Sequence, residues 1–425
     1  MPWICNPPKH WRVERAKNMF TKQNRPFEES DDVVTCFRGG IVTLRKNRRL
    51  TGYTESTQWS GYQGIKKGDL VIHVMDAFAG SIGVSDSDGK ATPVYSACTA
   101  KIDLNNYYYA YLLCEMARAG YIQALYRGIR ERSSDFRFEV FSRLYLPIPP
   151  RAEQDKIVRF LDWKVGAIDR LVAAKKKQIG LLGELSQYQI KSLLDKIDTK
   201  KKLTAVTTKI GSGKTPRGGA AVYIDDGVLF IRSQNVLHRE LQISNASYIS
   251  EETDESMRST RVFKNDVLLN ITGGSIGRSC VYTFDNHANV NQHVCIIRPN
   301  TEHILPAFLA LYLSSPEGQV KVKSCQNEGN RESLTFVQIG EFEVPCPPLE
   351  TQRRIAAALD AKTARLDKAA QNLSIEIALL AEYRARLISD AVTGKLDVRG
   401  GAAPEHGIVD ESTGINDDAA ESGGK

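Results

Sequence analysis

LPIPPRAEQDKIVRFLDWKVGAIDRL, at residues 146–171, returns in altered form as VPCPPLETQRRIAAALDAKTARLDKA, at residues 344–369. The two stretches align without a gap at a constant offset of 198 residues. Over residues 147–190, 14 of 44 positions are identical to their counterparts. A match of this length at one fixed offset indicates an internal duplication of the chain.

Each copy predicts one long helix. The prolines at its start mark an element boundary, because proline cannot continue a strand or the interior of a helix. After them, apolar residues recur at alternating intervals of four and three, which is the pattern of a coiled-coil seam. The predicted seam consists of Leu161, Val165, Ile168, Val172, Ile179 and Leu182 in the first copy, and of Leu359, Leu366, Leu373, Ile377, Leu380 and Leu387 in the second.

The first helix should run from about Glu153 to Ile197, a length of roughly 65–70 Å. Such a narrow apolar stripe needs a matching helix to cover it, and the second copy supplies one. We therefore expect an antiparallel pair within one chain. Two unrelated amphipathic helices on separate cores remain the alternative.

The segments before the two helices are also related, but more loosely. KKGDLVIHVMDAFAGSIGV from Lys66 resembles FKNDVLLNITGGSIGRSCV from Phe263, since both contain a Lys and an Asp at a turn, an apolar strand and Ser-Ile-Gly. Short β-like runs with glycine turns precede a shorter helical piece in each segment. The predicted fold is α+β, with two tandem, pseudo-two-fold related globular domains separated by two long antiparallel coiled-coil helices. Its parts are residues 1–146 (first globular domain), 147–202 (first long helix), 203–344 (second globular domain), 345–399 (second long helix) and 400–425 (a disordered acidic tail).

The composition narrows the class of protein. With 42% hydrophobic and 25% charged residues the chain is typical of a soluble globular protein, and no apolar run is long enough to span a bilayer. The eight cysteines form no CxxC pair, so we expect buried free thiols in a reducing cytoplasm rather than a metal site or disulfides. The net charge of +7 divides into +12 for residues 1–399 and −5 for the tail. A basic folded body favours a polyanionic partner.

No motif of a catalytic site stands out. GSGKT at Gly211 lacks the first glycine of a phosphate-binding loop, where Thr208 stands, and Pro216 follows where a helix should begin. NPPK at Asn6 has Lys9 in place of the aromatic residue of an amino-methyltransferase loop. We therefore predict no catalytic residue and no metal ligand in this chain.

Without a catalytic motif, the function that the sequence still supports is the binding of nucleic acid. TLRKNRRL at Thr43 surrounds an asparagine with four cations, and cations beside amides and aromatic rings suit phosphate contact and the reading of base edges. Solvated basic loops are the plain alternative. The candidate DNA-binding residues are Arg45, Lys46, Arg48, Arg49, Tyr53, Arg130 and Arg132 in the first domain, and Ser212, Lys214, Arg217, Arg232, Asn235, Arg278, Asn291, Gln292 and Arg331 in the second.

The whole arrangement resembles the specificity (S) subunit of type I restriction–modification systems. The resemblance rests on PIPPRAEQDKIVRFLD, PCPPLETQRRIAAALD and LISDAVTGKLDVRG at Leu387, and it extends to about Arg399. It implies that each globular domain is a target recognition domain that reads one half of a bipartite DNA site. The first domain departs from the common pattern, because it has no clear counterpart of the Gly-x-Thr-Pro element at Gly213 to Pro216.

The resemblance also implies a division of labour. The chain would be a non-catalytic, cytoplasmic subunit that binds double-stranded DNA, and its paired helices would set the spacer of the DNA site. Those helices would dock two modification subunits, which carry S-adenosylmethionine, and restriction subunits would join them with ATP and Mg. The alternatives are a coiled-coil architectural DNA-binding protein without sequence specificity, and a self-sufficient methylating or cleaving enzyme.

Overall fold

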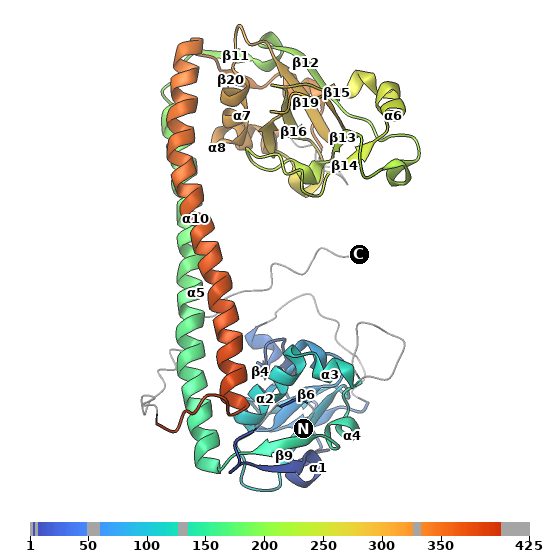
Figure 1. The fold of residues 1–425 in the computed structure, drawn as a ribbon, viewed down its shortest axis with the longest axis vertical. Helices are drawn as coiled ribbons and strands as arrows, with labels where there is room; N and C mark the ends of the chain where they lie inside the picture. The colour runs from blue at the N-terminus through green and yellow to red at the C-terminus, as the bar shows by residue number, and fades with distance from the viewer. Residues whose placement is uncertain (1–2, 5–6, 49–59, 126–134, 326–332, 401–425) are drawn as a thin grey trace. The chain divides into compact units, whose positions relative to one another are not determined.

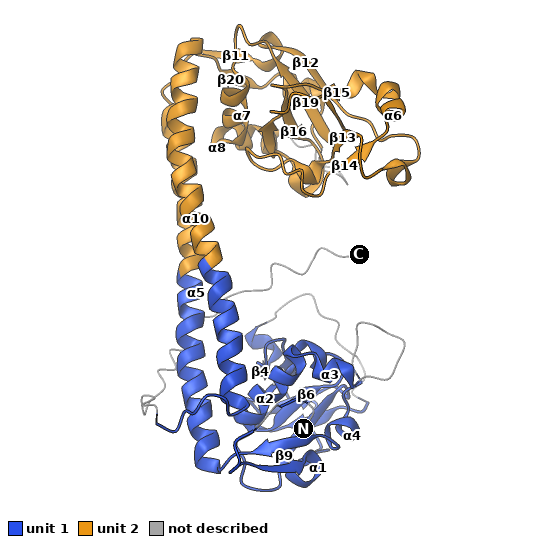
Figure 2. Ribbon diagram, viewed as in Figure 1, with its two compact units in different colours: residues 1–174, 376–425 blue, residues 175–375 orange. Residues whose placement is uncertain are grey.

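The chain forms two compact units. Unit 1 comprises residues 1–174 and 376–425, and unit 2 comprises residues 175–375 (Figure 2). The prediction of a disordered tail falls almost entirely on residues 401–425, which lie outside the described residues. The computed structural model describes residues 3–4, 7–48, 60–125, 135–325 and 333–400 (Figure 1).

Two long helices follow the repeated proline-rich stretches. Helix α5 spans Arg151–Leu194 and helix α10 spans Leu349–Val392, and each has 44 residues. Both ends keep the offset of 198, and each helix begins directly after a Pro-Pro pair. At 1.5 Å per residue, each is about 66 Å long. The predicted α+β fold with a long helix pair is confirmed, with α5 ending three residues before the expected Ile197.

The two helices pack together in antiparallel fashion. In unit 1, Leu161 in the first quarter of α5 and Leu387 near the end of α10 belong to the same hydrophobic cluster. In unit 2 the ends are reversed, since Leu194 of α5 shares a cluster with Leu359 of α10. All twelve predicted seam residues are buried or half-buried. These contacts exclude the alternative of two helices on separate cores.

The globular part of unit 1 combines one larger sheet with a covering helix. Strands β2, β9, β6 and β7 form an antiparallel sheet in that order, and α2 packs on β6 and β7. Two-stranded sheets pair β1 with β10, β3 with β4, and β5 with β8. Tyr108, Leu112 and Met116 of α2 recur at helical spacing and are completely buried. The elements are β1 (Arg12–Arg15), α1 (Ala16–Met19), β2 (Phe20–Lys22), β3 (Val34–Cys36), β4 (Val42–Leu44), the 3-10 helix η1 (Arg45–Asn47), β5 (Gln63–Ile65), β6 (Leu70–His73), η2 (Ala77–Ala79), β7 (Ile82–Val84), β8 (Gly89–Ala91), β9 (Tyr95–Ala100), α2 (Asn106–Arg118), α3 (Tyr121–Ala124), α4 (Phe138–Phe141) and β10 (Tyr145–Ile148).

The globular part of unit 2 repeats this plan and adds a second sheet. Strands β12, β19, β16 and β17 form the sheet that corresponds to the one in unit 1, and β11 pairs with β20 as β1 pairs with β10. The added sheet has the order β14-β13-β18-β15, in which β13 and β18 run parallel. The elements are β11 (Lys200–Lys202), η3 (Leu203–Ala205), β12 (Thr207–Ser212), η4 (Gly219–Val222), β13 (Val228–Ile231), η5 (Ser233–Asn235), β14 (Ser247–Ile249), α6 (Glu251–Ser256), η6 (Arg258–Thr260), β15 (Arg261–Val262), β16 (Val267–Asn270), η7 (Gly273–Ser275), β17 (Ser279–Val281), β18 (Ala288–Val290), β19 (Val294–Pro299), α7 (Pro306–Ser314), α8 (Pro316–Ser324), α9 (Phe336–Gly340) and β20 (Glu343–Pro345).

The strand registers correct one detail of the sequence alignment. Strands β6 and β7 pair with the same register as β16 and β17 at an offset of 197 residues. In that register Ser81–Gly83 leads into β7, whereas Ser275–Gly277 belongs to the turn before β17. The two Ser-Ile-Gly triplets are therefore not equivalent. The equivalent glycines are Gly80 and Gly277, whose φ angles of 80° and 85° favour glycine because it has no Cβ.

The repeated glutamine of the duplicated stretch anchors each helix to its globular part. Gln154 and Gln352 are both fully buried. The side-chain oxygen of Gln154 accepts a hydrogen bond from the backbone N–H of Asn105, directly before α2, at 2.8 Å. That of Gln352 accepts one from Leu305, directly before α7, also at 2.8 Å. The glutamine is therefore structural, and it explains why this position matches in both copies.

Replacing Gln352 by alanine should destabilise unit 2 by about 3 kcal/mol, because the half-buried Leu305 N–H and the carbonyls of His303 and Pro347 would lose their partner. Urea unfolding followed by circular dichroism measures this loss. All four tryptophans belong to unit 1, so the tryptophan fluorescence transition should stay in place. The control is Gln371→Ala on an exposed face of α10, which should change stability by less than about 0.5 kcal/mol.

The repeated aspartate of the Leu-Asp pair also joins helix and globular part, but through different partners. In unit 1 the hydroxyl of Tyr111, on α2, donates to Asp162 at 2.7 Å. In unit 2 Asp360 pairs with Arg239, which lies in a loop between β13 and β14, at 2.5 Å. Burial raises the pKa of Asp162, and the hydrogen bond from Tyr111 opposes this rise. The equivalent aspartates thus bind a residue of helix α2 in unit 1 and a residue of a loop in unit 2.

The described cysteines are all free thiols. Five of these seven are buried: Cys36, Cys98, Cys280, Cys295 and Cys346. Burial raises the pKa of Cys98 and of Cys280 to about 12, so both remain protonated at neutral pH. Cys5 lies outside the described residues. Among the described helices, none is both long and apolar enough to cross a membrane.

Candidate nucleic-acid interface

Four strand ends of unit 2 meet at one edge. Strand β12 ends opposite the beginning of β19, and so does β16. Backbone hydrogen bonds tie the following segments to each other, from Lys214 to Val290 (3.1 Å) and from Asn291 to Ile231 (3.0 Å). We name this set the loop edge of unit 2. It consists of residues 213–217, 232–235, 271–278 and 291–293.

The first segment of the loop edge explains the glycine in GSGKT. Gly213 packs so closely on β18 that a Cβ atom there would lie 1.8 Å from the carbonyl oxygen of Val290. No side chain fits in that space. The chain turns sharply after Ser212 and presents Lys214 and Arg217 to solvent, while Pro216 is buried. The segment is followed by a short 3-10 helix rather than the α-helix of a phosphate-binding loop.

A chain of hydrogen bonds connects three segments of the loop edge. The Thr215 hydroxyl donates to the side-chain oxygen of Gln292. The Gln292 amide nitrogen bonds Nε2 of His293 at 3.0 Å, and Nδ1 of His293 bonds the Thr272 hydroxyl at 2.5 Å. Gln292 itself is exposed, so its amide is held in a defined orientation at the surface. Thr215, Thr272 and His293 were not among the predicted residues. Thr272 and His293 stand just after β16 and just before β19, both buried strands, which is the signal that could have found these two. Thr215 follows β12, which is only half-buried.

The remaining candidate residues of the loop edge differ in whether their side chains are accessible for contact with DNA. Asn235 is only 3% exposed, and its side chain bonds the backbone of Arg232 and Gln242 at 2.9 Å each. It shapes the loop, and the prediction that it contacts a base is not supported by its position. Arg232 stacks over Tyr223 with its carbon Cζ 5.7 Å from the ring centroid. Arg278 is half-buried near His238, and burial, with the charge of Arg278 adding to it, lowers the pKa of that histidine.

The basic segment of unit 1 lies beside the corresponding sheet. Arg45 begins η1 and donates from Nε to Thr35 at 3.4 Å, and Lys46 pairs with Asp32 at 2.6 Å. Arg48 is exposed and lies over the Phe37 ring at 5.7 Å. Next to this ring Arg38, a cation that the sequence interpretation did not select, approaches Asp76 at 3.9 Å. Asp76 follows β6, so Arg38 lies near the edge of unit 1 that matches the loop edge of unit 2. Arg45 and Lys46 instead contact residues on and directly before β3.

Five predicted residues lie outside the described residues, and no geometry is assigned to them. They are Arg49, Tyr53, Arg130, Arg132 and Arg331.

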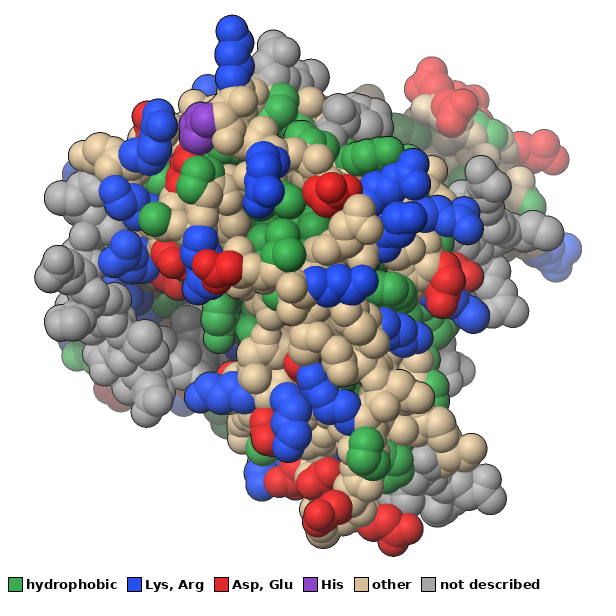
Figure 3. Space-filling model, turned by 90° about the horizontal axis from the view of Figure 1, so that it is seen from below, with side chains coloured by type: hydrophobic (Ala, Val, Ile, Leu, Met, Phe, Trp, Pro, Cys, Tyr) green, Lys and Arg blue, Asp and Glu red, His purple; other side chains and the backbone are tan. Residues whose placement is uncertain are grey.

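Charges are mixed on the surface. Figure 3 shows one face on which lysine and arginine side chains lie between acidic, hydrophobic and neutral ones. The candidate cation Lys46 is also partly neutralised by Asp32. Contact with a polyanion would therefore be local, through loops, rather than through one broad positive field.

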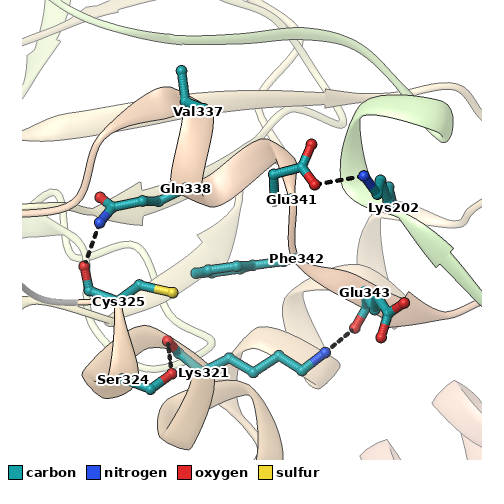
Figure 4. A pocket seen from close by; sticks show the side chains of 9 residues that line it. All are labelled: Lys202, Lys321, Ser324, Cys325, Val337, Gln338, Glu341, Phe342 and Glu343. Carbon is teal, nitrogen blue, oxygen red and sulfur yellow. Dashed lines mark hydrogen bonds and ion pairs between the residues drawn. The ribbon is translucent and has the colours of Figure 1, made fainter.

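A surface hollow of about 450 Å³ in unit 2 contains none of the candidate residues. Around the Phe342 ring, Lys202 pairs with Glu341 at 2.6 Å and Lys321 donates to the carbonyl of Glu343 at 2.7 Å (Figure 4). Both lysines that line the hollow are thus already bonded. We therefore do not assign the functional site to this hollow.

The chain is similar in sequence to known type I restriction enzyme specificity subunits. A family model described as "Type I restriction modification DNA specificity domain" matches residues 187–377. The chain is 24% identical to the specificity subunit of the type I restriction enzyme EcoBI from Escherichia coli, over 97% of this chain and 92% of that protein. It is 22% identical to the EcoKI specificity subunit of E. coli K12, over 46% of this chain and 42% of that protein.

Two solved structures share the fold. A chain from a type I R-M system superposes with a TM-score of 0.70 at 15% identity, covering 92% of this chain and all of that one. The HsdS subunit from Thermoanaerobacter tengcongensis superposes with a TM-score of 0.50 at 16% identity, covering 92% of this chain and 99% of that one. The agreement covers both globular parts and both long helices, because almost the full chain is matched.

Proposed function

Since the chain belongs to the family of type I restriction–modification DNA specificity subunits, we propose that it selects the DNA sequence on which such a complex acts. Each globular part reads one half of a bipartite site in double-stranded DNA. The chain itself is a non-catalytic subunit. Its family implies DNA and the methyltransferase and restriction subunits as partners.

One observation carries the proposal. The same strand plan occurs once per repeat, and in both repeats an equivalent buried glutamine joins it to a long helix. A protein that uses two equivalent modules reads two half-sites, as dimeric DNA-binding proteins do. An architectural protein without sequence preference, the alternative from sequence, is not supported, because the relative that matches nearly the whole chain is a specificity subunit.

Gln292 is the best candidate for base reading in unit 2. Its amide has two hydrogens and its oxygen two lone pairs, and the bonds to Thr215 and His293 use one of each. One donor and one acceptor remain, which is what a bidentate contact to an adenine edge requires. Lys214 and Arg217, exposed on the neighbouring segment, supply phosphate contacts that position the loop edge on the duplex.

The helix pair sets the gap between the half-sites. Each helix runs for 44 residues without an interruption, about 66 Å, which exceeds the roughly 34 Å of one DNA turn. A continuous helix pair of this length suits a ruler between the two half-sites.

Two modification subunits dock on the helices. Leu181 and Leu185 on α5 are 52% and 43% exposed, and their counterparts at the offset of 198, Leu379 and Tyr383 on α10, are 60% and 53% exposed. An exposed apolar pair at the same position of both repeats suits two copies of one partner. S-adenosylmethionine, ATP and Mg would be bound by the partner subunits.

The test is to treat a library of random-sequence DNA with the chain, modification subunits of its system and S-adenosylmethionine, and to map methylation by long-read sequencing. We expect one motif with two defined halves and a gap of fixed length. Changing the gap by about five base pairs, half a helical turn, should abolish methylation. The chain without modification subunits should transfer no methyl group. A single continuous motif, or methylation without sequence preference, would contradict the proposal.

A further inference from the structure

The loop between β13 and β14 of unit 2 reaches from the loop edge to the long helix α10. Its beginning, residues 232–235, belongs to the loop edge. The buried Asn270 side chain donates to the carbonyls of Ser233 (2.8 Å) and Val236 (3.4 Å), and an isolated bridge pairs Val236 with Leu241. These bonds make residues 232–242 one compact segment. A movement of residue 239, at the tip of the segment, therefore also moves residues 232–235 at its beginning.

Arg239, at the tip of this segment, is fixed at both its backbone and its side chain. Its φ angle is 66°, a left-handed conformation that is unfavourable for arginine, and its N–H donates to the carbonyl of Ser279 at 2.7 Å. The guanidinium donates to Asp360 at 2.5 Å and to the Thr363 hydroxyl at 3.0 Å, both on α10. Thr363 is only 2% exposed. The strained backbone is maintained by a two-point contact with the helix.

Unit 1 uses the equivalent aspartate differently. Asp162 accepts from Tyr111, which belongs to α2 in the scaffold rather than to a loop. If the contact with Asp360 served only to attach the globular part of unit 2 to α10, a residue of a scaffold helix could make it, as Tyr111 does in unit 1. The arginine instead connects α10 to the segment whose other end carries Arg232 and lies beside Asn291.

We infer that Arg239 is a positioning residue for DNA reading by unit 2: it ties the segment 232–242 to α10 and so fixes where the loop edge meets the duplex. The inference rests on the proposed function. It does not require Arg239 to touch DNA, and its side chain is already bonded to Asp360 and Thr363. The helix that sets the spacing thereby also orients one of the reading segments.

The experiment uses the complex of the chain with its modification subunits and DNA libraries randomised in one half-site at a time. Arg239→Gly keeps the left-handed backbone and removes the contact. It should lower affinity for the preferred site about tenfold and relax sequence preference in the half-site read by unit 2 only. The charge-exchanged variant Arg239→Asp with Asp360→Arg should restore most of that preference, since aspartate tolerates a left-handed backbone.

Two controls distinguish the outcomes. Tyr111→Phe removes the scaffold contact of unit 1 and should leave preference in both half-sites unchanged. The thermal midpoint of Arg239→Gly should fall by no more than about 3 °C, which excludes unfolding as the cause. Unchanged preference in Arg239→Gly, or equal relaxation of both half-sites, would overturn the inference. A wild-type complex without a bipartite motif would instead overturn the proposed function.

Discussion

A complex whose unit 1 carries residues 16–144 of another family member should methylate a DNA motif that is new in one half and unchanged in the other. The exchanged segment contains the reading loops and the sheet of unit 1 but leaves β1 and β10 in place. The acceptor for the N–H of residue 105, Gln154, lies on the retained helix. Because a backbone group makes this contact, a donor segment of different sequence can preserve it.

The expected change is large. Each mismatched base pair costs about 1–3 kcal/mol in specific protein–DNA recognition, so a new half-site of three or more base pairs lowers affinity for the old site roughly 10³-fold or more. Methylation mapping measures the new motif directly. Exchanging residues 203–342 of unit 2 is the matched variant and should change the other half. A change in both halves, or in neither, would contradict the assignment of one half-site to each globular part.

Loss of one docked partner should follow when the exposed apolar pair of one helix is replaced. Leu379→Asp with Tyr383→Asp on α10 should reduce the complex from two modification subunits to one. Removing two buried apolar contacts and placing two carboxylates in the interface costs at least about 3 kcal/mol, more than a hundredfold in Kd. Native mass spectrometry of the complex counts the copies. Leu181→Asp with Leu185→Asp on α5 should remove the other copy.

The control for this experiment places one carboxylate on a different side of each helix. Ala381 and Gly183 are exposed, equivalent at the offset of 198, and two residues away from the apolar positions, so they face elsewhere on the helix. Ala381→Asp and Gly183→Asp should retain two copies. Two copies bound to the Leu379→Asp, Tyr383→Asp variant would exclude this surface as the docking site.

The site was predictable only in part. Lys214, Arg217 and Gln292 are exposed on segments that the structure brings to one edge, so they remain predicted DNA-binding residues. Asn235 has the same residue type as a base-reading side chain, but it is buried and bonded within its own loop. Composition cannot distinguish these cases, because whether an amide faces solvent or backbone depends on the path of the loop.

The sequence by itself determined the duplication, the two long helices and their antiparallel seam, because a period of four and three over many turns and a constant offset are local patterns that tertiary contacts rarely override. Only the tertiary structure decided what the matching residues do. Gln352 and Asp360 bind groups 47 and 121 residues away along the chain, and Gly213 is required by the approach of Val290. Hydrogen bonds and close packing join residues through space, so their partners become visible only once the chain has folded.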